Sequence, residues 1–297
     1  MRFLSVGLAL LVATGCTTNQ VGVQHTAQLE TRTRGLALLD DEASSLVGMS
    51  ANSCQVDTSS GAIGMDVDVA PGEDDYVTDA VGTDAIIVGQ GGVYVLDGTG
   101  FGSSEPMVPM ANVSDARLTQ NLDIVALSND GTVTWNGADP VQTSGASDFA
   151  IDRITGTAFV VDGNGLTAVT PGGVTSTAAG AYDLVAYDPA TDAVYVAAVG
   201  GTEVRALEVN GTQRWAAELG GFITSLDDMG SAGSVAIMME LDSGMGELVV
   251  LDGRSGEQLS SITTPSAAEQ VLVGNNGESM ALVLPSEVHF FTVDAAE

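Results

Sequence analysis

The sequence contains no lysine and few aromatic residues, and its eight arginines stand against 39 aspartates and glutamates. Without lysine the chain has no amine for a Schiff base, no Ser-Lys pair and no phosphate-binding loop of the Walker type. The formal net charge of −31 repels nucleic-acid phosphates and anionic lipid headgroups, so we expect no nucleic-acid partner. The acidity is compatible with a bound cation or a cationic partner, but a solvated acidic coat is the simpler interpretation.

Cysteine and histidine are equally scarce, with two residues of each. Two histidines far apart in the sequence, His25 and His289, do not supply a catalytic triad or a histidine-rich zinc site. The chain has no Gly-x-Ser-x-Gly and no His-Glu-x-x-His motif. With Cys16 modified as argued below, Cys54 is the only free thiol and forms no internal disulfide. It is either an incidental structural thiol, which we favour, or a reactive or intermolecular one.

The first sixteen residues have the pattern of a bacterial lipoprotein signal. Arg2 gives a positive start, residues 3–12 are apolar, and Ala13-Thr14-Gly15 precedes Cys16 as in a lipobox. About ten apolar residues are too few to cross a bilayer as a helix, so this is a processing signal. We expect a lipid-modified Cys16, with an ordinary secretory signal as the alternative. The protein is then expected in the bacterial cell envelope, and Thr17 favours the outer membrane, facing the periplasm or the cell surface.

The rest of the chain divides into two regions of different texture. Residues 16–61 are expected to form a lipidated tether, partly irregular, in which the leucines of 28–49 have roughly helical spacing. Residues 62–297 consist of short β-prone runs separated by Gly, Asp and Asn. We therefore expect a signal peptide over 1–15, the tether over 16–61 and an all-β domain over 62–297.

The β-prone runs form hairpins that recur at intervals of about 33 to 46 residues. Units of this size are expected to begin near Tyr76, Asp115, Asp148, Tyr182, Phe222 and Ala268. The spacing predicts an all-β fold, a β-propeller of about six four-stranded blades, with seven blades as the alternative.

Three turns between these runs share the form Asp-x-x-Thr/Ser-Gly or a close variant. They are residues 152–156, 188–192 and 252–256. The aspartate accepts hydrogen bonds from nearby backbone amides, and the glycine permits a positive φ. Three copies of one turn indicate a repeated structural unit.

Residues 193–220 resemble the repeat of PQQ-like β-propellers, a unit of the WD40 and YVTN type. Ala193-Val-Tyr-Val-Ala197 is followed by Asn210-Gly-Thr-Gln-Arg-Trp-Ala-Ala-Glu-Leu-Gly220, and 251–259 is similar to a second copy. The resemblance covers about 182–264 and implies a propeller; we expect Trp215 to pack between blades. A lipid anchor followed by a propeller is also similar to the outer-membrane assembly lipoprotein of the β-barrel insertion machinery.

The last predicted blade has only three β-prone runs before the chain ends at Glu297. An open outer edge would leave backbone donors and acceptors unpaired. In residues 62–69, apolar residues alternate with Asp66 and Asp68, the pattern of a half-buried strand. We predict that this N-terminal strand pairs with residues 288–293 and closes the ring.

The densest acidic cluster is the best candidate for a metal site, but its sequence supports such a site only weakly. Its members are Asp66, Asp68, Glu73, Asp74 and Asp75. Calcium prefers several converging oxygen ligands, but the spacing fits no EF-hand loop, so a solvated edge is favoured and no metal is assigned. Gly163-Asn-Gly165 resembles a dinucleotide-binding turn, yet a strand follows it instead of a helix. We expect no cofactor and no catalytic residue.

The sequence therefore predicts a non-catalytic envelope lipoprotein whose propeller is a protein-interaction scaffold, held at the membrane by its N-terminal lipid and bound to an envelope protein. One alternative is a propeller enzyme, a hydrolase or lactonase-like protein, which requires polar side chains converging on the central channel. The other is a surface lipoprotein that binds calcium or a small molecule.

Overall fold

The computed structural model describes twelve stretches of the chain, almost all of them β-strand. They are residues 22–30, 34–39, 45–50, 53–58, 63–67, 76–81, 84–89, 91–96, 106–136, 138–274, 279–284 and 287–294. One 3-10 helix, Gly230–Ala232, interrupts the strands within these stretches. No helix in the described parts is long and apolar enough to cross a membrane.

The strands form seven four-stranded antiparallel sheets. The first three blades are β2 (Arg34–Leu39), β3 (Ser45–Ser50), β4 (Ser53–Thr58) and β5 (Ile63–Val67); β6 (Tyr76–Val81), β7 (Asp84–Gly89), β8 (Gly92–Leu96) and β9 (Val108–Pro109); and β10 (Val113–Leu118), β11 (Ile124–Ser128), β12 (Thr132–Trp135) and β13 (Val141–Gln142). The next two are β14 (Asp148–Ile151), β15 (Ala158–Val161), β16 (Gly165–Thr170) and β17 (Gly173–Ala179); and β18 (Leu184–Asp188), β19 (Ala193–Ala197), β20 (Glu203–Glu208) and β21 (Gln213–Glu218). The last two are β22 (Phe222–Asp228), β23 (Ser234–Glu240), β24 (Gly246–Asp252) and β25 (Gln258–Thr264); and β26 (Gln270–Val273), β27 (Ser279–Val283) and β28 (Glu287–Asp294) with β1 (Gly22–Glu30).

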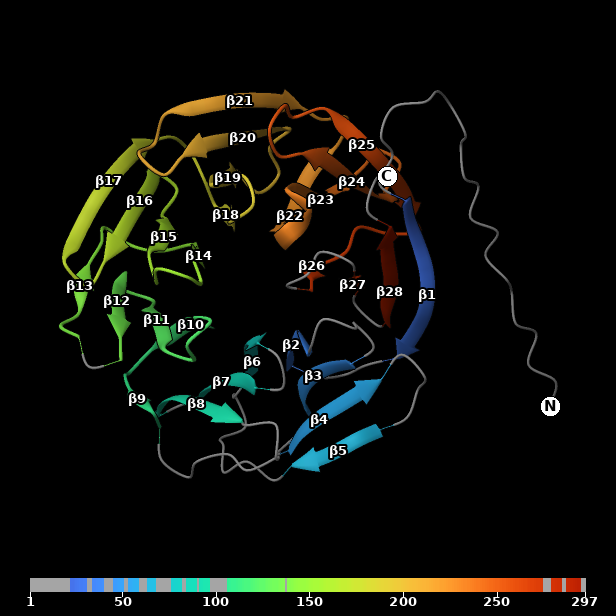
Figure 1. Ribbon diagram of the computed structural model, residues 1–297. Helices are drawn as coiled ribbons and strands as arrows, with labels where there is room; N and C mark the ends of the chain where they lie inside the picture. The colour runs from blue at the N-terminus through green and yellow to red at the C-terminus, as the bar shows by residue number, and fades with distance from the viewer. Residues whose placement is uncertain are drawn as a thin grey trace.

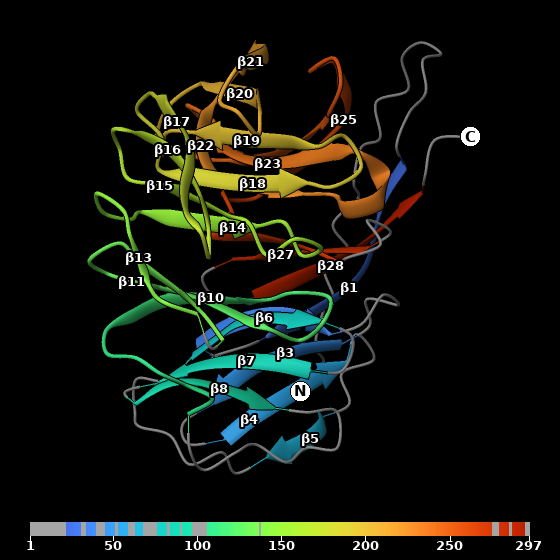
Figure 2. The ribbon, with the colours of Figure 1, turned by 60° about the vertical axis from the view of Figure 1, so that its left-hand side comes forward.

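The blades are arranged in a ring around a central axis, with the first strand of each blade innermost (Figure 1). Neighbouring innermost strands contact one another around the ring, and β2 contacts β26 where the ring closes. Seen from the side, β6, β10, β14 and β18 lie one above another (Figure 2). The predicted all-β propeller is confirmed. The six units expected from Tyr76 onward are all present, and the seventh blade, given by the alternative count, is formed by β2 to β5.

An N-terminal strand does complete the last blade, but it is β1 and not the predicted segment 62–69. In the structure β1 pairs antiparallel with β28, Val23 opposite Val293 and Leu29 opposite Val288. Residues Ile63–Val67 form β5 and pair with β4 instead. Period-two alternation marks a strand with one exposed face, and every outermost strand of a propeller has such a face. The pattern therefore does not say which outer edge a strand completes.

The boundary between tether and propeller also differs from the prediction. Strands β1 to β4 lie between residues 22 and 58, which the sequence assigned to a tether with a helix over 28–49. Short apolar runs such as Gly35 to Leu39 fit a helix and a buried strand equally well by periodicity. Contacts with strands distant in sequence decide between the two structures. Here β1 pairs with β28, and β2 packs beside β6.

The hydrophobic core lies between neighbouring blades. Where side-chain burial is described, the second strand of a blade is buried along almost its whole length, as in β11, β15 and β19. One core cluster joins Tyr195 and Ala206 of one blade to Ile237 and Val249 of the next. Strands covered on both faces have continuous apolar runs, which explains the runs seen in the sequence. The outermost strands β17 and β21 contain only exposed and half-buried residues, and β25 adds two buried ones, Ile262 and Thr264.

Candidate functional site

The innermost strands of five blades line a cavity on the ring axis with a volume of about 590 Å³. Its walls come from β10, β14, β18, β22 and β26 and from the residues next to them. Seven of the lining residues carry charged side chains: Arg117, Asp148, Arg153, Asp183, Asp227, Asp228 and Glu269. The cavity wall is therefore polar, and most of its charge is negative.

Arg153 is fully engaged by groups of two other blades. Its two terminal nitrogens donate to the two Asp79 oxygens at 2.7 and 2.8 Å, and one of them also donates to the Leu118 carbonyl at 2.6 Å. Asp79 also accepts from the Leu118 amide at 2.7 Å. Burial by itself would raise the pKa of Asp79, but the Arg153 guanidinium holds the pKa below its usual value. This bidentate pair clamps three successive blades together.

Arg117 is paired in a similar way within its own strand. Its Nη2 donates to Asp115 at 2.8 Å, and its Nη1 donates to the Thr78 carbonyl at 3.3 Å. The guanidinium lies 5.8 Å from the centre of the Phe149 ring. Burial raises the pKa of Asp115 to about 7 even though Arg117 opposes that shift. The two terminal nitrogens of Arg117 thus have carboxylate and carbonyl partners, whereas its Nε is buried without a hydrogen-bond partner among the described residues.

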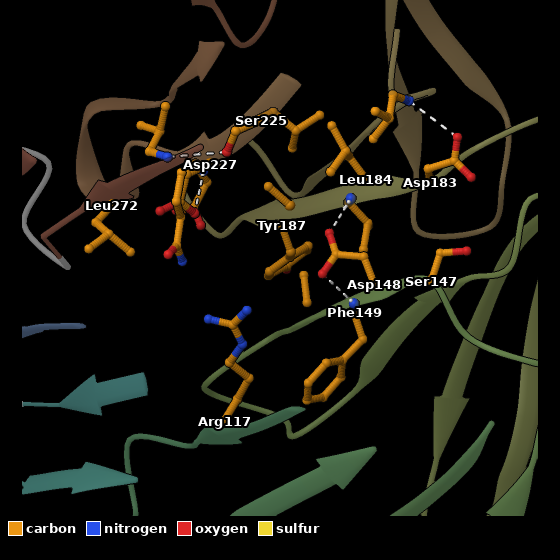
Figure 3. Close-up of a pocket in the computed structure, with 18 of the residues that line it drawn as sticks. Arg117, Ser147, Asp148, Phe149, Asp183, Leu184, Tyr187, Ser225, Asp227 and Leu272 are labelled. Carbon is orange, nitrogen blue, oxygen red and sulfur yellow. Dashed lines mark hydrogen bonds between the residues drawn. The ribbon is translucent and has the colours of Figure 1, made fainter. Parts of the chain in front are cut away.

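None of the four aspartates that line the cavity has an arginine at ion-pair distance among the described residues, and three of the four, Asp148, Asp227 and Asp228, have raised pKa values. Asp148 accepts from the Phe149 and Val185 amides at 2.8 and 3.0 Å, and Asp227 accepts from the Asp228 and Val273 amides at 3.0 Å each. Asp228 accepts from the Gly230 amide at 2.8 Å. Figure 3 shows Asp148 and Asp227 in different parts of the cavity wall, with Tyr187 between them.

Burial raises the pKa of all three carboxyl groups. The pKa of Asp227 rises to about 8, from burial and from repulsion by Asp228, and that of Asp228 rises to about 6. The pKa of Asp148 is raised chiefly by burial. Near pH 7 the adjacent pair Asp227 and Asp228 therefore holds about one proton between its two carboxyl groups.

Three exposed apolar residues lie at the same end of two adjacent blades. Val199 follows β19, Phe222 begins β22 and Met245 precedes β24; their exposed fractions are 57%, 47% and 41%. The turn after Val199 is bound to β22, since the Gly200 amide donates to the Ile223 carbonyl at 2.8 Å. Val199 also lines the cavity, and its amide donates to Asp183 at 3.2 Å. We call Val199, Phe222 and Met245 the mouth patch.

The recurrent aspartate turns are structural. Asp152 and Asp188 each accept from the amide two residues later, at 2.9 and 2.8 Å. Gly156 has φ +72°, and Asp192 takes the same left-handed conformation with φ +52°. Trp215 Nε1 donates to the Gly253 carbonyl of the next blade at 2.9 Å. These turns join blades, and the first of them also contributes Arg153 to the cavity wall.

The residues singled out in the sequence lie away from this cavity or outside the described residues. Cys16 and the acidic residues Asp68, Glu73, Asp74 and Asp75 lie outside them, and Asp66 is in the outermost strand β5. Cys54 is in β4, opposite Met49 of β3. His25 and His289 are brought to neighbouring strands, β1 and β28. Among the described residues no group of three His, Cys, Asp or Glu side chains is arranged to hold a metal ion.

The sequence patterns did not identify the cavity residues, because these aspartates are spread over several repeats and form no motif. Asp115 and Asp148 were used only to mark where repeats begin, and Asp227 was not singled out at all. A signal did exist: Asp79, Asp148 and Asp227 each lie in the first strand of a unit. Each accepts a hydrogen bond from the backbone amide of the next innermost strand.

No known protein-family profile matches the chain, and no curated protein matches it in sequence. Solved structures do match it in fold. They include a chain of the mitotic checkpoint complex (TM-score 0.68, 11% identity, 98% of each chain covered) and BBS1N in complex with ARL6DN (TM-score 0.67, 10% identity, 93% of this chain and 98% of that one). The C-terminal WD40 domain of Sif2 also matches (TM-score 0.62, 10% identity, 90% and 99% covered). At such identities the likeness shows a WD40-type propeller fold and nothing further.

Proposed function

We propose that this protein is a non-catalytic, lipid-anchored scaffold of the bacterial cell envelope, whose propeller binds another envelope protein at the end of the ring that carries the mouth patch. The observation that carries the proposal is the mouth patch itself. Three apolar side chains, each more than two fifths exposed, lie at the same end of two adjacent blades of a strongly acidic protein. Apolar side chains exposed on one face are found at protein interaction surfaces.

Two further points support a scaffold. Two of the solved structures similar in fold are described as complexes with other proteins. The finer assignment, to a PQQ-like lipoprotein with a lipid on Cys16 and an outer-membrane location, is part of the proposal and rests on the sequence patterns. The rigid ring suits this role, because turns at its ends vary while the sheets stay fixed.

The test is capture of a partner with a matched pair of surface variants. Wild-type protein, Phe222→Ser and Ile154→Ser are each tagged and recovered from detergent-solubilised envelopes of the bacterium that expresses them. Ile154 is 63% exposed but lies in the turn between β14 and β15, at the other end of the ring. We expect one membrane protein to be enriched with wild type and Ile154→Ser and lost with Phe222→Ser. Equal enrichment with all three proteins, or none with wild type, contradicts the proposal.

A second candidate function is a hydrolase that acts in the channel. The observation in its favour is the carboxyl pair Asp227 and Asp228, whose pKa values of about 8 and about 6 give one protonated and one ionised group near neutral pH. This is the polar constellation that the enzyme alternative requires. Hydrolysis of a panel of chromogenic esters, lactones and glycosides by wild type, abolished in Asp227→Asn, would establish it; no turnover by wild type would exclude these substrates.

A further inference from the structure

The first strand, β1, enters the ring at the end where the innermost strands finish. Neighbouring innermost strands run parallel, since Ser225 and Asp227 of β22, two residues apart, accept from amides two residues apart in β26. Strands alternate in direction within a blade, so β28 runs parallel to β26, and β1 runs opposite to both, with Gly22 beside Asp294. Figure 2 shows β18 and β28 pointing to the same side of the molecule. We call this end of the ring the tether end.

The proposed lipid on Cys16 keeps the tether end close to the membrane. Gly22 follows Cys16 by only six residues, and a chain of that length spans at most about 22 Å. The strand β1 has nine residues and extends about 30 Å from the tether end towards the mouth end. The tether is therefore shorter than the blade to which it is attached. The ring cannot stand on the bilayer that holds the lipid with its mouth patch downward.

Three apolar side chains are exposed at the tether end. Leu122 lies in the β10–β11 turn, Ile154 in the β14–β15 turn and Val174 next to the β16–β17 turn; their exposed fractions are 45%, 63% and 50%. The first two of these turns contact each other, because the Gln120 amide donates to the Arg153 carbonyl at 2.9 Å. We call Leu122, Ile154 and Val174 the tether-end patch.

Leu122 is unfavourable for the fold in two respects. Its φ is +63°, a left-handed conformation that costs a leucine conformational energy. The other described non-glycine residues with a positive φ are Asn112 and Asp192, whose residue types adopt that conformation readily. Because the Leu122 side chain is also exposed, core packing does not offset the strain. A leucine in this place suits a contact outside the ring better than it suits the fold.

A zwitterionic bilayer surface matches the tether end better than an anionic one. Exposed apolar side chains at a membrane surface insert at the boundary between headgroups and acyl chains. In the described turns at this end, the exposed charged residues are Asp123, Asp139, Asp192, Arg254 and Glu257. Four of these five are acidic, so they repel anionic headgroups and leave apolar contact as the source of attraction.

We propose that the tether end of the ring lies against the membrane, with the tether-end patch inserted at the surface of a zwitterionic bilayer and the mouth patch turned away from it. This inference rests on the proposed function, because the lipid on Cys16 provides the tether. The contact is too small to hold an untethered protein, since even a single lipid chain gives only marginal binding. A short tether keeps the patch at a high effective concentration near the bilayer, so a weak contact is enough to orient the ring.

The experiment measures which end of the lipidated, full-length protein touches phosphatidylcholine vesicles. A nitroxide label is attached at the tether end through Asn121→Cys or at the mouth end through Ser243→Cys, both exposed positions, in a Cys54→Ser background that has no other free thiol. Collisions of the label with oxygen, which concentrates in the bilayer, are compared with its collisions with a water-soluble nickel complex. The reference is the same labelled protein carrying Cys16→Ser, which has no lipid and stays in solution.

We expect the ratio of oxygen to nickel collisions to rise on vesicles for the label at the tether end and to keep its solution value for the label at the mouth end. The patch variant Leu122→Asn/Ile154→Ser should lose this rise, whereas the control Val199→Ser/Met245→Ser, at the opposite end and with the same net charge, should keep it. Vesicles that contain phosphatidylglycerol should give a smaller rise, which added salt restores.

The variant Leu122→Asn by itself separates a binding role from a structural one. Asparagine adopts a positive φ more readily than leucine, so this change should raise the melting temperature while it reduces the collision ratio on vesicles. A residue needed for the fold alone would lower the melting temperature when it is replaced.

Three results would overturn the inference: a tether-end label that keeps its solution ratio on vesicles, an equal rise in wild type and the patch variant, or a rise at the mouth end instead. Flotation with the vesicles separates these results from a failure of the proposed function. If wild type floats and its tether-end label stays in water, the lipid anchor stands and the docking is wrong. If wild type does not float, the lipid anchor fails and the inference fails with it.

Discussion

Individual aspartates have different structural roles in this propeller, depending on their hydrogen-bond and ion-pair partners. Asp188 is fully buried but receives hydrogen bonds from Ala190, Thr191 and Tyr195 within its own blade. Asp79 is buried and paired with an arginine. Asp227 is half-buried and has only backbone amides as hydrogen-bond partners among the described residues. The same residue type thus closes a turn, clamps blades or has a raised pKa in the cavity wall.

The raised pKa values of three aspartates predict an unusual dependence of stability on pH. The pKa values of Asp115, Asp227 and Asp228 are about 7, 8 and 6 in the folded protein. An unfolded aspartate has a pKa of about 3.9, so the folded state binds more protons and loses stability as the pH rises from about 4 to about 8. The charged groups facing Asp227 are Asp228 on its own strand and Arg117 on β10. We expect the melting temperature of wild type to fall across this range and that of Asp227→Asn to fall less.

Calorimetric melting curves at intervals of pH test this prediction. Asp130→Asn is the matched control, because Asp130 is exposed and its pKa is lowered by hydrogen bonds from Ser128 and Thr132. Its pH profile should follow that of wild type above pH 5. A wild-type melting temperature that rises between pH 5 and pH 8 would contradict the assignment of raised pKa values.

Trp215 is predicted to hold two blades together. Its ring lies 5.9 Å from that of Tyr195, and a Cβ added to Gly256 of the next blade would come within 2.8 Å of it. Truncating a buried tryptophan costs about 3–5 kcal/mol, and since Trp215 is half-buried we expect Trp215→Ala to lie near the lower end. Trp215→Phe keeps a ring and loses the hydrogen bond to Gly253, a cost of about 1 kcal/mol. Urea unfolding measures both, and an unchanged midpoint for Trp215→Ala would place the side chain outside the packing.

At the scale of elements, turns bind blades that are not neighbours in the chain. Arg153 stands in the β14–β15 turn and reaches Asp79 of β6, passing the end of β10. The Gln120 amide donates to the Arg153 carbonyl at 2.9 Å, so the backbone of this turn is fixed as well. Three of the seven blades are therefore connected through one side chain.

Removing that side chain should be costly. Arg153→Met leaves the Asp79 carboxylate buried and unpaired, which typically costs about 3–5 kcal/mol. The double variant Arg153→Met/Asp79→Asn removes the uncompensated charge and should recover part of the loss. Arg254→Met, at an exposed arginine in the β24–β25 turn, should change the free energy of unfolding by less than about 0.5 kcal/mol. Similar denaturation midpoints for Arg153→Met and Arg254→Met would show that the clamp does not contribute.

The closing strand gives a second prediction at this scale. Because β1 pairs with β28 along its whole length, deleting residues 17–30 exposes the outer edge of the last blade. We expect that deletion to lower the melting temperature and to promote self-association, measured by light scattering. Deleting only residues 17–21 leaves β1 intact and should have little effect. The deletion of 17–55, which would matter little if these residues were only a tether, removes β1, β2, β3 and the first half of β4 and should prevent ring closure. Equal stability of the two short deletions would contradict closure by β1.

At the scale of the whole molecule, membrane attachment is predicted to depend on Cys16 alone. Each buried methylene of a lipid chain contributes about 0.8 kcal/mol, and the acidic propeller adds no attraction for anionic lipids. Cys16→Ser should therefore leave the protein folded and move it from the membrane to the soluble fraction. Fractionation followed by a high-salt wash measures the distribution. If the variant stays with the membrane after the wash, either the lipid anchor is not at Cys16 or a second anchor exists.

Much of the architecture followed from the sequence because a propeller is built from local units. Each hairpin, such as β19 and β20, joins residues close in the chain, so its turn residues and its apolar runs are enough to identify it. The recurring turns at Asp152, Asp188 and Asp252 mark the repeat for the same reason. The six units from Tyr76 onward and the role of an N-terminal strand in closing the ring were accessible in this way.

The remaining features depend on residues that are far apart in the chain. Pairing of β1 with β28 joins the two ends of the chain, and no local pattern distinguishes that partner from β4 or any other edge. The charge of the cavity arises only when Asp148 of β14 and Asp227 of β22 face the same space while Arg117 and Arg153 are bound to other carboxylates. A sequence determines which side chains are acidic, but burial and distance between blades determine their pKa values and their ligands. The sequence therefore determined the propeller fold and six of its blades, whereas the tertiary structure decided which strand closes the ring and which residues form the site.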